Sequence, residues 1–312
     1  MKFRVIFLKK KYIYFSVLIF ITLLLLTIIL ISNNSSLTFN NFSNNKEFKA
    51  DFNGDGKEET LYVKNVNGNY TLTLKAKDKN YSIITADNSS PIGSYCSYWP
   101  MRVSLIDVSR DKIPEIFVQA SNNNLPLQHV FFWKGDKFEN VFSNSNNILG
   151  FIDCKNNRTP KVISGRLQND TIWLSNYIFL NYKFKNYNYE SNNTFVGKDT
   201  VFTFIKFIQS LPQNKEYKPK EIFSSNMSNK SLSMIDKLSE DNNTYIFQDA
   251  IFSENKCDKD GNTSEFIWSL NFRGVSNKDK NVIKNYTLSI TLTPDENSKE
   301  KYYFKISSIN LK

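Results

Sequence analysis

The sequence predicts an N-terminal transmembrane helix, then a β-rich repeat domain, then an α+β domain with an antiparallel sheet. Three observations predict this class. Residues 12–32 are uncharged and almost wholly apolar. Residues 46–196 hold short alternating runs broken by Asn-Gly, Gly-Asp and Asp-Lys turns, which is typical of β-hairpins. Residues 197–312 combine a helical apolar period with longer alternating runs.

The apolar run has the length of a membrane-spanning helix. Its 21 residues would extend roughly 31 Å, and a bilayer's hydrocarbon core is about 30 Å thick. No Ala-x-Ala cleavage site follows it. Five basic residues and no acidic one precede it, so the positive-inside bias places residues 1–11 in the cytoplasm and residues 33–312 outside. We therefore expect an uncleaved, single-pass signal anchor in the cell membrane, with an extracellular remainder.

The formal charge of +10 is unevenly distributed along the chain. Five of the 40 basic residues precede residue 12, so the rest of the chain carries 35 against 30 acidic residues. These charges form no Arg-rich stripe and no long block of one sign, which excludes nucleic-acid binding. Residues 33–45 are rich in Asn and Ser, and they predict a flexible linker.

Apolar–polar alternation predicts strands in the repeat domain at 60–64, 70–74, 81–85, 102–106, 115–119, 130–133 and 171–174. In the last domain, helical spacing of apolar residues predicts a helix over 199–211, with Asp199 as its N-cap and Pro212 ending it. A second helix is predicted over 231–238. Four strands are predicted at 245–252, 265–272, 286–292 and 301–309.

The loop at 51–59 carries the sharpest chemical pattern. Oxygen-bearing side chains stand at its first, third, fifth and ninth positions, around a glycine at the sixth: Asp51, Asn53, Asp55 and Glu59. A hard cation such as Ca²⁺ takes six to eight oxygen ligands, and glycine permits the turn that wraps them. The alternative is an ordinary turn in which Asp and Asn side chains cap their own backbone.

Two later segments share this frame. Residues 107–115 keep oxygen ligands at the same four positions (Asp107, Ser109, Asp111 and Glu115), but Lys112 replaces the glycine. Residues 153–161 keep only Asp153 and an Asn, with lysines at other ligand positions, so no metal is expected there. The first Asp recurs after 56 and then 46 residues, which is compatible with one propeller blade per repeat.

The pattern Asp-x-Asp/Asn-x-Asp-Gly-x-x-Asp/Glu before a strand resembles the FG-GAP/VCBS family of extracellular β-propeller repeats, over about residues 46–190. The resemblance implies a propeller-like domain and calcium at the first loop, with Lys57 adding its carbonyl to the four side chains. It implies a second site at 107–115. Only about three repeat units fit, so a partial or compact repeat domain is an equal alternative. The helix-then-sheet order of residues 197–312 resembles a nuclear-transport-factor-two-like fold.

The cysteines fit no metal-ligand spacing. Cys96 and Cys154 fall in the same repeat region and are the expected disulfide, which leaves Cys257 free; three unpaired thiols are the alternative.

The aromatic group Tyr95, Tyr98 and Trp99 is a candidate surface for stacking on a sugar or peptide, and hairpin packing is its alternative role. The single histidine, His129, is interpreted as an ordinary strand residue. Asp258 to Asn262 is interpreted as a hairpin turn, because Asp-Gly pairs favour hairpins.

These features predict a membrane-anchored, extracytoplasmic binding or scaffolding protein with a calcium-stabilised β-repeat domain. The expected partner is another envelope protein or a cell-surface glycan. The alternative is a membrane-anchored envelope enzyme, such as a cell-wall hydrolase, with a carboxylate site that sequence does not reveal. A sensor subunit is a third option, although residues 1–11 leave little room for an output domain.

Overall fold

The computed structural model describes residues 10–32, 40–41, 47–77, 79–86, 91–154, 160–168, 170–187, 196–214, 218–295 and 300–312. The chain divides into two compact units, residues 1–38 and residues 39–312. The predicted cytoplasmic tip falls largely outside the described residues, and so does the predicted linker apart from Asn40 and Asn41.

The first unit contains one helix, α1 (Lys10–Ser32). Among the described residues, no helix is both long enough and apolar enough to cross a membrane. The predicted transmembrane signal anchor at 12–32 is therefore wrong, and the single-pass membrane location built on it falls with it.

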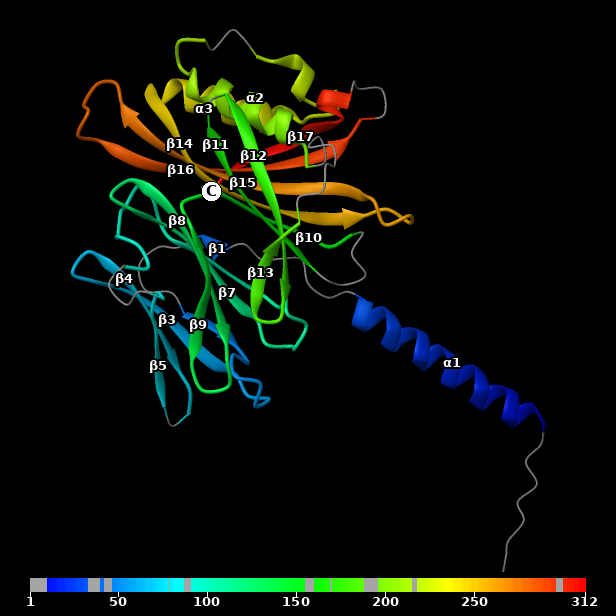
Figure 1. Cartoon of the computed structure of the whole chain (residues 1–312). Coiled ribbons are helices and arrows are strands. Elements are labelled where there is room, and N and C mark those ends of the chain that lie inside the picture. The colour runs from blue at the N-terminus through cyan, green and yellow to red at the C-terminus, as the bar shows by residue number, and fades with distance from the viewer. Residues whose placement is uncertain are drawn as a thin grey trace, which may run out of the picture. The chain divides into compact units, whose positions relative to one another are not determined.

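The second unit is built mostly from strands, and its described strands form three separate sheets (Figure 1). A four-stranded sheet contains β2 (Glu47–Ala50), β3 (Glu59–Val66), β4 (Asn69–Lys75) and β5 (Asn80–Ile83), paired in chain order. A five-stranded sheet has the order β1 (Asn40–Asn41), β6 (Arg102–Ile106), β7 (Glu115–Asn122), β8 (Leu125–Trp133), β9 (Phe138–Asn144).

The third sheet has eight strands in the order β13-β12-β11-β10-β14-β15-β16-β17. Its first four strands are β10 (Ile148–Ile152), β11 (Lys161–Gln168), β12 (Thr171–Leu180) and β13 (Lys183–Asn186). Its last four are β14 (Asn243–Cys257), β15 (Thr263–Ser276), β16 (Ile283–Pro294) and β17 (Phe304–Leu311). All neighbours are antiparallel except β10 and β14, which pair in parallel.

This topology corrects the predicted fold class. The described strands form no propeller, because β10 leaves the repeat region and joins β14 instead of closing a blade. The antiparallel strands predicted near the C-terminus do form, but they share one sheet with β10–β13. Strands from both sides of residue 197 therefore belong to a single sheet.

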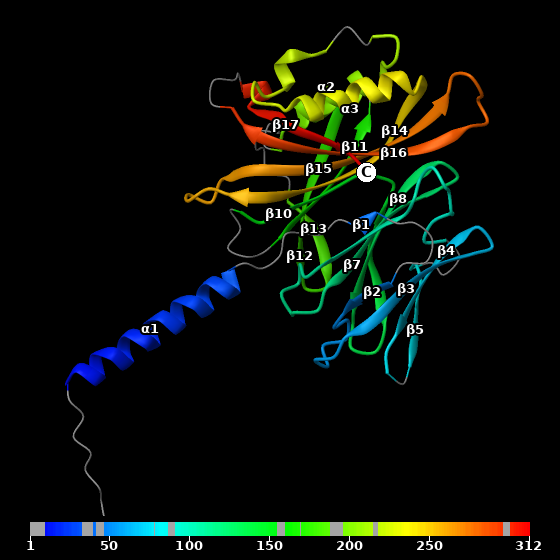
Figure 2. The same cartoon turned by 180° about the vertical axis from the view of Figure 1, so that it is seen from behind.

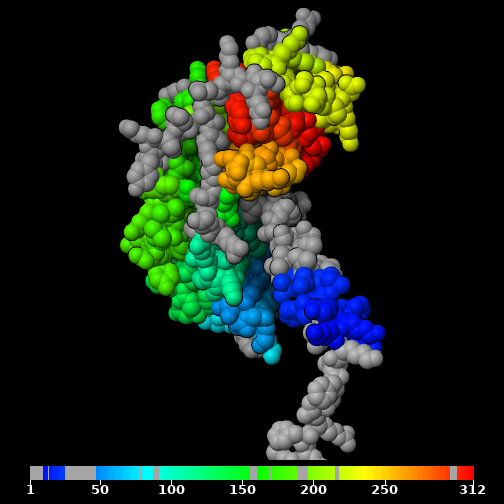
Figure 3. Space-filling view, turned by 90° about the vertical axis from the view of Figure 1, so that its right-hand side faces the viewer, coloured from blue at the N-terminus to red at the C-terminus, as the bar shows by residue number. Residues whose placement is uncertain are grey.

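Two helices cover one face of the eight-stranded sheet, opposite the two smaller sheets (Figures 1 and 2). They are α2 (Lys198–Gln209) and α3 (Asn229–Glu240), and short 3-10 turns occur at Lys220–Ile222 and Glu300–Tyr302. Figure 3 shows α3, in yellow, against the red C-terminal strand β17, with which it is in contact. Apolar side chains of α2, including Val201, Phe204 and Ile208, join Phe252 and Trp268 in the largest core cluster.

The two helices predicted at 199–211 and 231–238 are confirmed as α2 and α3, but the N-cap of α2 differs from the predicted one. The N-cap of α2 is Gly197, whose φ of 69° is left-handed, and Asp199 lies in the first turn instead. An acidic residue there still interacts favourably with the helix dipole. Ser228 caps α3 and accepts a hydrogen bond from the backbone N–H of Ser231.

The five-stranded sheet is buried on both faces. One face, with Val103, Ile116 and Phe131, packs against Leu61, Leu72 and other residues of the four-stranded sheet. Its other face meets the eight-stranded sheet. There Phe117 packs edge-on against Phe151 at 5.0 Å between ring centroids. Burial on two sides explains why β7 is apolar through its middle instead of strictly alternating.

A buried ion pair joins these two sheets. Arg102 on β6 and Asp249 on β14 are 2% and 3% exposed, and Nη2 of Arg102 lies 3.1 Å from Oδ1 of Asp249. Arg102 Nη1 donates to the carbonyl of Ser269 at 3.0 Å, and the indole N–H of Trp99 donates to Asp249. Burial raises the pKa of Asp249 and lowers that of Arg102, and each charge partly offsets the other's shift.

The disulfide connects Cys154 and Cys257, whose Cα atoms are 5.6 Å apart, and Cys96 is a free thiol. The expected Cys96–Cys154 pairing is corrected accordingly. The parallel pairing of β10 with β14 places Phe151 opposite Ser253, so Cys154, just beyond β10, comes close to Cys257, the last residue of β14. That neighbour relation joins segments 103 residues apart, and local sequence carries no sign of it.

Breaking the disulfide is expected to destabilise the fold. Closing a loop of about 100 residues restricts the unfolded chain, so Cys257→Ser is expected to lower the free energy of unfolding by about 2–5 kcal/mol. Urea unfolding followed by circular dichroism measures this change. Cys96→Ser is the matched control and should stay within about 1 kcal/mol of the wild type.

Removing one partner of the buried ion pair should cost more than removing a surface pair. Asp249→Asn leaves the Arg102 charge buried without its counter-ion, so we expect a loss of about 3–5 kcal/mol in unfolding free energy. The exposed pair Lys134–Glu139, at 3.0 Å, is the control, and Lys134→Met should cost less than about 1 kcal/mol. Equal losses for the two variants would contradict a buried-charge origin.

Candidate functional site

The loops 51–59 and 107–115 fold into the same hydrogen-bonded frame. In the first, Asp51 accepts the backbone N–H groups of Gly54 at 2.7 Å and Gly56 at 2.9 Å. In the second, Asp107 accepts those of Arg110 at 2.6 Å and Lys112 at 3.0 Å. The fifth-position carboxylate accepts the seventh N–H in both loops. The repeat seen in the sequence is therefore a repeat of local structure.

The backbone conformation is shared as well. Gly54 and Gly56 have φ of 77° and 80°, and Arg110 and Lys112 have φ of 67° and 72° at the equivalent positions. Non-glycine residues occupy this left-handed region at a cost. The second loop thus adopts the glycine-type turn without glycine, held by the hydrogen bonds to Asp107.

The two loops differ at the ninth-position glutamate. Glu59 uses both oxygens: Oε2 accepts from Phe52 N–H at 2.8 Å, and Oε1 accepts from Asn53 Nδ2 at 3.0 Å. Glu115 accepts from Val108 N–H at 2.7 Å through Oε2. Its Oε1 is buried without a hydrogen-bond partner among the described residues. The difference arises because the third position is Asn in one loop and Ser in the other.

Glu115 belongs to a group of three carboxylates. One oxygen each of Asp107, Asp111 and Glu115 lie within 4.8 Å of one another, and among the described residues this is the acidic group gathered closely enough for one ion. Glu115 is 1% exposed, whereas Asp111 is exposed to solvent. Ser109 lies beside the group, with its hydroxyl 3.4 Å from Oδ1 of Asp107. These are oxygen donors, which Ca²⁺ prefers.

The electrostatics of Glu115 follow from its burial. Burial raises the pKa of Glu115 to about 7, against a partial lowering by the Val108 N–H bond. Burial also raises the pKa of Glu59. A buried carboxylate near two others is unfavourable when ionised, and a bound cation removes that penalty.

The third segment with this frame, which begins at Asp153, makes its backbone hydrogen bonds to a residue far away in the sequence. The backbone N–H of Cys154 donates at 2.6 Å to Oε2 of Glu254 on β14, and the N–H of Asp153 donates to the same oxygen. The other carboxylate oxygen of Glu254 accepts from the Thr263 hydroxyl. Glu254 thus replaces the missing ninth-position glutamate as a backbone clamp. Residues 155–159, including Lys155, lie outside the described residues.

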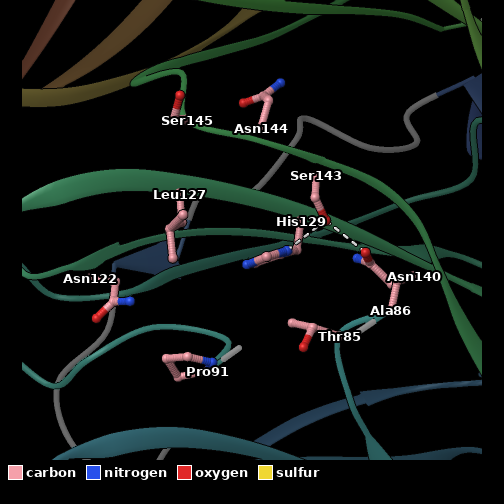
Figure 4. Close-up of a pocket in the computed structure, with 10 residues that line it drawn as sticks. All are labelled: Thr85, Ala86, Pro91, Asn122, Leu127, His129, Asn140, Ser143, Asn144 and Ser145. Carbon is pink, nitrogen blue, oxygen red and sulfur yellow. Dashed lines mark hydrogen bonds between the residues drawn. The ribbon is translucent and has the colours of Figure 1, made fainter. Parts of the chain in front are cut away.

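A separate cavity of about 380 Å³ is lined by His129, Asn140, Ser143 and neighbouring polar residues (Figure 4). Sequence analysis did not predict this group, because its lining comes from β7, β8, β9, the turn after β9 and the segment after β5. His129 Nδ1 lies 2.9 Å from Ser143 Oγ, and Ser143 Oγ lies 2.6 Å from Asn140 Oδ1.

In this arrangement the Ser143 hydroxyl directs its hydrogen to Asn140 and not to His129. The Asn140 amide nitrogen donates to the carbonyls of Val130 and Phe142, so its oxygen is the acceptor that faces Ser143. Ser143 therefore gives its proton to Asn140, and His129 Nδ1 donates to the serine oxygen. A nucleophilic serine must instead give its proton to the base. The three side chains thus form a hydrogen-bonded chain along one wall of the cavity.

The aromatic candidates divide between two environments. Tyr95 packs edge-on against Tyr70 at 5.8 Å between ring centroids, which is the hairpin-packing role. Trp99 is buried, and its indole N–H is bound to Asp249. Tyr98 is half-buried, as Tyr95 is, and lies beside Arg273, whose Cζ is 5.5 Å from the tyrosine ring centroid. Trp99 is therefore the enclosed member of the three, and Tyr95 and Tyr98 remain partly accessible.

No protein-family model, curated protein or solved structure matches this chain.

The raised pKa of Glu115 predicts how Glu115→Gln behaves without divalent cations. From about pH 4.5 to about pH 7 the unfolded state loses this proton while the folded state keeps it, so the wild type loses stability as pH rises. In chelator at pH 8, Glu115→Gln should therefore have a higher melting temperature than the wild type. Its free energy of unfolding should be higher by up to roughly 3 kcal/mol. The two proteins should converge at pH 4. Melting curves across pH measure this, and a constant offset would contradict it.

Proposed function

We propose that this protein is a non-catalytic binding or scaffolding protein whose β-sheet unit is stabilised by Ca²⁺ at loop 107–115. One observation carries the proposal: the buried Glu115 carboxylate keeps one oxygen without a hydrogen-bond partner beside Asp107 and Asp111. A buried charged oxygen without a partner is costly, and a cation in the carboxylate group would satisfy it.

The ion is assigned to loop 107–115 and not to loop 51–59. The resemblance to FG-GAP/VCBS repeats implied Asp51, Asn53, Asp55, Lys57 and Glu59 as the main ligand set. In that loop the Glu59 oxygens already have protein partners, so the loop is complete without an ion. The calcium-loop likeness is retained at 107–115, without the propeller.

The location of this loop suits a structural role for the ion. It connects β6 to β7, which is the central strand of the doubly buried five-stranded sheet. Glu115 is the first residue of β7 and pairs with Ile106. A cation held there would fix the turn between two core strands, and with it the surface that a protein or glycan partner would contact.

A binding role is favoured over hydrolysis by how two of the clustered polar side chains are used. Ser143 donates its proton to Asn140, and both oxygens of Glu254 hold loop backbone or Thr263. Neither group is set up as a nucleophile or general acid. A binding module requires no such group.

Calcium titration of the full chain tests the proposal. We expect Ca²⁺ to raise the melting temperature of the wild type at pH 8, and Mg²⁺ to raise it less, because Mg²⁺ demands a stricter octahedral geometry. Excess Ca²⁺ should reverse the order expected in chelator, so that the wild type melts above Glu115→Gln. Isothermal titration calorimetry gives the stoichiometry, expected to be one ion per chain.

Glu59→Gln is the matched control, since it changes the equivalent residue of the other loop. It should keep the full calcium-dependent stabilisation. Calcium binding that disappears in Glu59→Gln and persists in Glu115→Gln would move the site to the first loop. No calcium effect on the wild type would refute the proposal, and turnover abolished by a single carboxylate substitution would refute the non-catalytic role.

A further inference from the structure

A second, smaller cavity lies where the β7–β8 turn meets the start of β14 and the end of β15. Its volume is about 210 Å³, and Trp99, Asn124, Phe247, Gln248 and Arg273 are among the residues that line it. It is separate from the cavity of His129 and shares no lining residue with it. It draws on both the five-stranded and the eight-stranded sheet, so only the folded unit creates it.

Arg273 brings a positive charge to this cavity without an acidic partner. No carboxylate among the described residues lies within 4.0 Å of its guanidinium, whereas the other arginine at this sheet junction, Arg102, has Asp249. The Nε of Arg273 is buried with no hydrogen-bond partner among the described residues. A partly buried guanidinium without an acidic partner is suited to a carboxylate, which can accept two parallel hydrogen bonds from it.

Tyr98 holds the guanidinium in place. The Cζ of Arg273 lies 5.5 Å from the Tyr98 ring centroid, within the range of a cation–π contact. The Tyr98 hydroxyl donates to Asn124 Oδ1 at 3.2 Å. Asn124 has a left-handed φ of 61° in the β7–β8 turn, a conformation that Asn tolerates. The charge is therefore oriented before any ligand arrives, which lowers the ordering cost of binding.

The remaining walls fix the size and polarity of the ligand. The indole N–H of Trp99 is engaged by Asp249, so its ring faces the cavity as an apolar surface together with Phe247 and Pro126. The volume of about 210 Å³ equals about seven waters at roughly 30 Å³ each. That is room for a carboxyl group on a short apolar stem, below the size of a typical drug-like ligand.

We propose that the cavity at Arg273 binds the carboxylate of a small organic acid, with Arg273 as the charge partner and Trp99 and Phe247 around the stem. The carboxylate could be that of a free acid or of a peptide C-terminus. This deepens the proposed binding function, on which it rests for its biological role, but it uses none of the residues of the calcium loop.

Paired probes that differ only in charge test the site. Butyrate and butyramide represent the free acid, and N-acetyl-leucine and its amide represent a peptide C-terminus. Binding to the full chain is followed by ligand-observed NMR and by tryptophan fluorescence, with calcium and with chelator. We expect each acid to bind at least about tenfold tighter than its amide, and the tighter acid identifies the source.

Substitutions locate the binding. Arg273→Gln should weaken the acids about tenfold or more, and the exposed Arg166→Gln is the control for general loss of charge and should leave binding unchanged. If Arg273→Gln fails to fold by circular dichroism, Tyr98→Leu replaces it, since it removes the platform and should weaken binding several-fold. Equal affinity for acid and amide, or equal loss in Arg166→Gln, overturns the inference. Such a failure with intact calcium stabilisation refutes this site alone.

Discussion

The fold depends on the burial of one sheet between two others. The five-stranded sheet packs one face on the four-stranded sheet and the other on the eight-stranded sheet. Three buried polar side chains of the five-stranded sheet contact the eight-stranded sheet: Arg102 pairs with Asp249, Gln119 donates to the carbonyl of Ala250 at 3.1 Å, and Gln128 donates to that of Ile148 at 2.9 Å. These contacts align two sheets whose strands are far apart in sequence, because a buried polar group without its partner would be costly.

This junction also explains where the functional candidates lie. Trp99 and Asp249 form part of the buried contact, and the cavity of Arg273 opens directly beside them. The Cys154–Cys257 bond closes the parallel β10–β14 pair on the same eight-stranded sheet. The carboxylate loop 107–115 enters the doubly buried sheet at β7. A ligand or ion at either place would therefore act on the contact between sheets, and not on an isolated surface loop.

The two Asp-rich loops show how one sequence pattern serves different purposes. Both loops use Asp at the first position to tie down backbone N–H groups and Glu at the ninth to hold the second N–H. The loop with the better match to a calcium pattern satisfies its glutamate internally through Asn53. In the loop with the poorer match, Glu115 is buried and its Oε1 has no hydrogen-bond partner among the described residues. The match to the motif predicts the conformation of the turn. The packing around the turn decides whether a carboxylate oxygen remains without a protein partner and is available to an ion.

Local features were determined by the sequence alone: the strand alternation, the helix at 198–209, the hairpin turn at Asp258 and the repeated loop frame. These depend on interactions within a few residues. The tertiary structure alone decided that β10 joins β14, that Cys154 meets Cys257, that Arg273 faces a cavity, and that Glu115 is the buried carboxylate. The continuous apolar run at 12–32 predicted a membrane-spanning helix, which the structure does not support. Partners distant in the chain are selected by burial and charge compensation across whole sheets, and no local pattern encodes that choice.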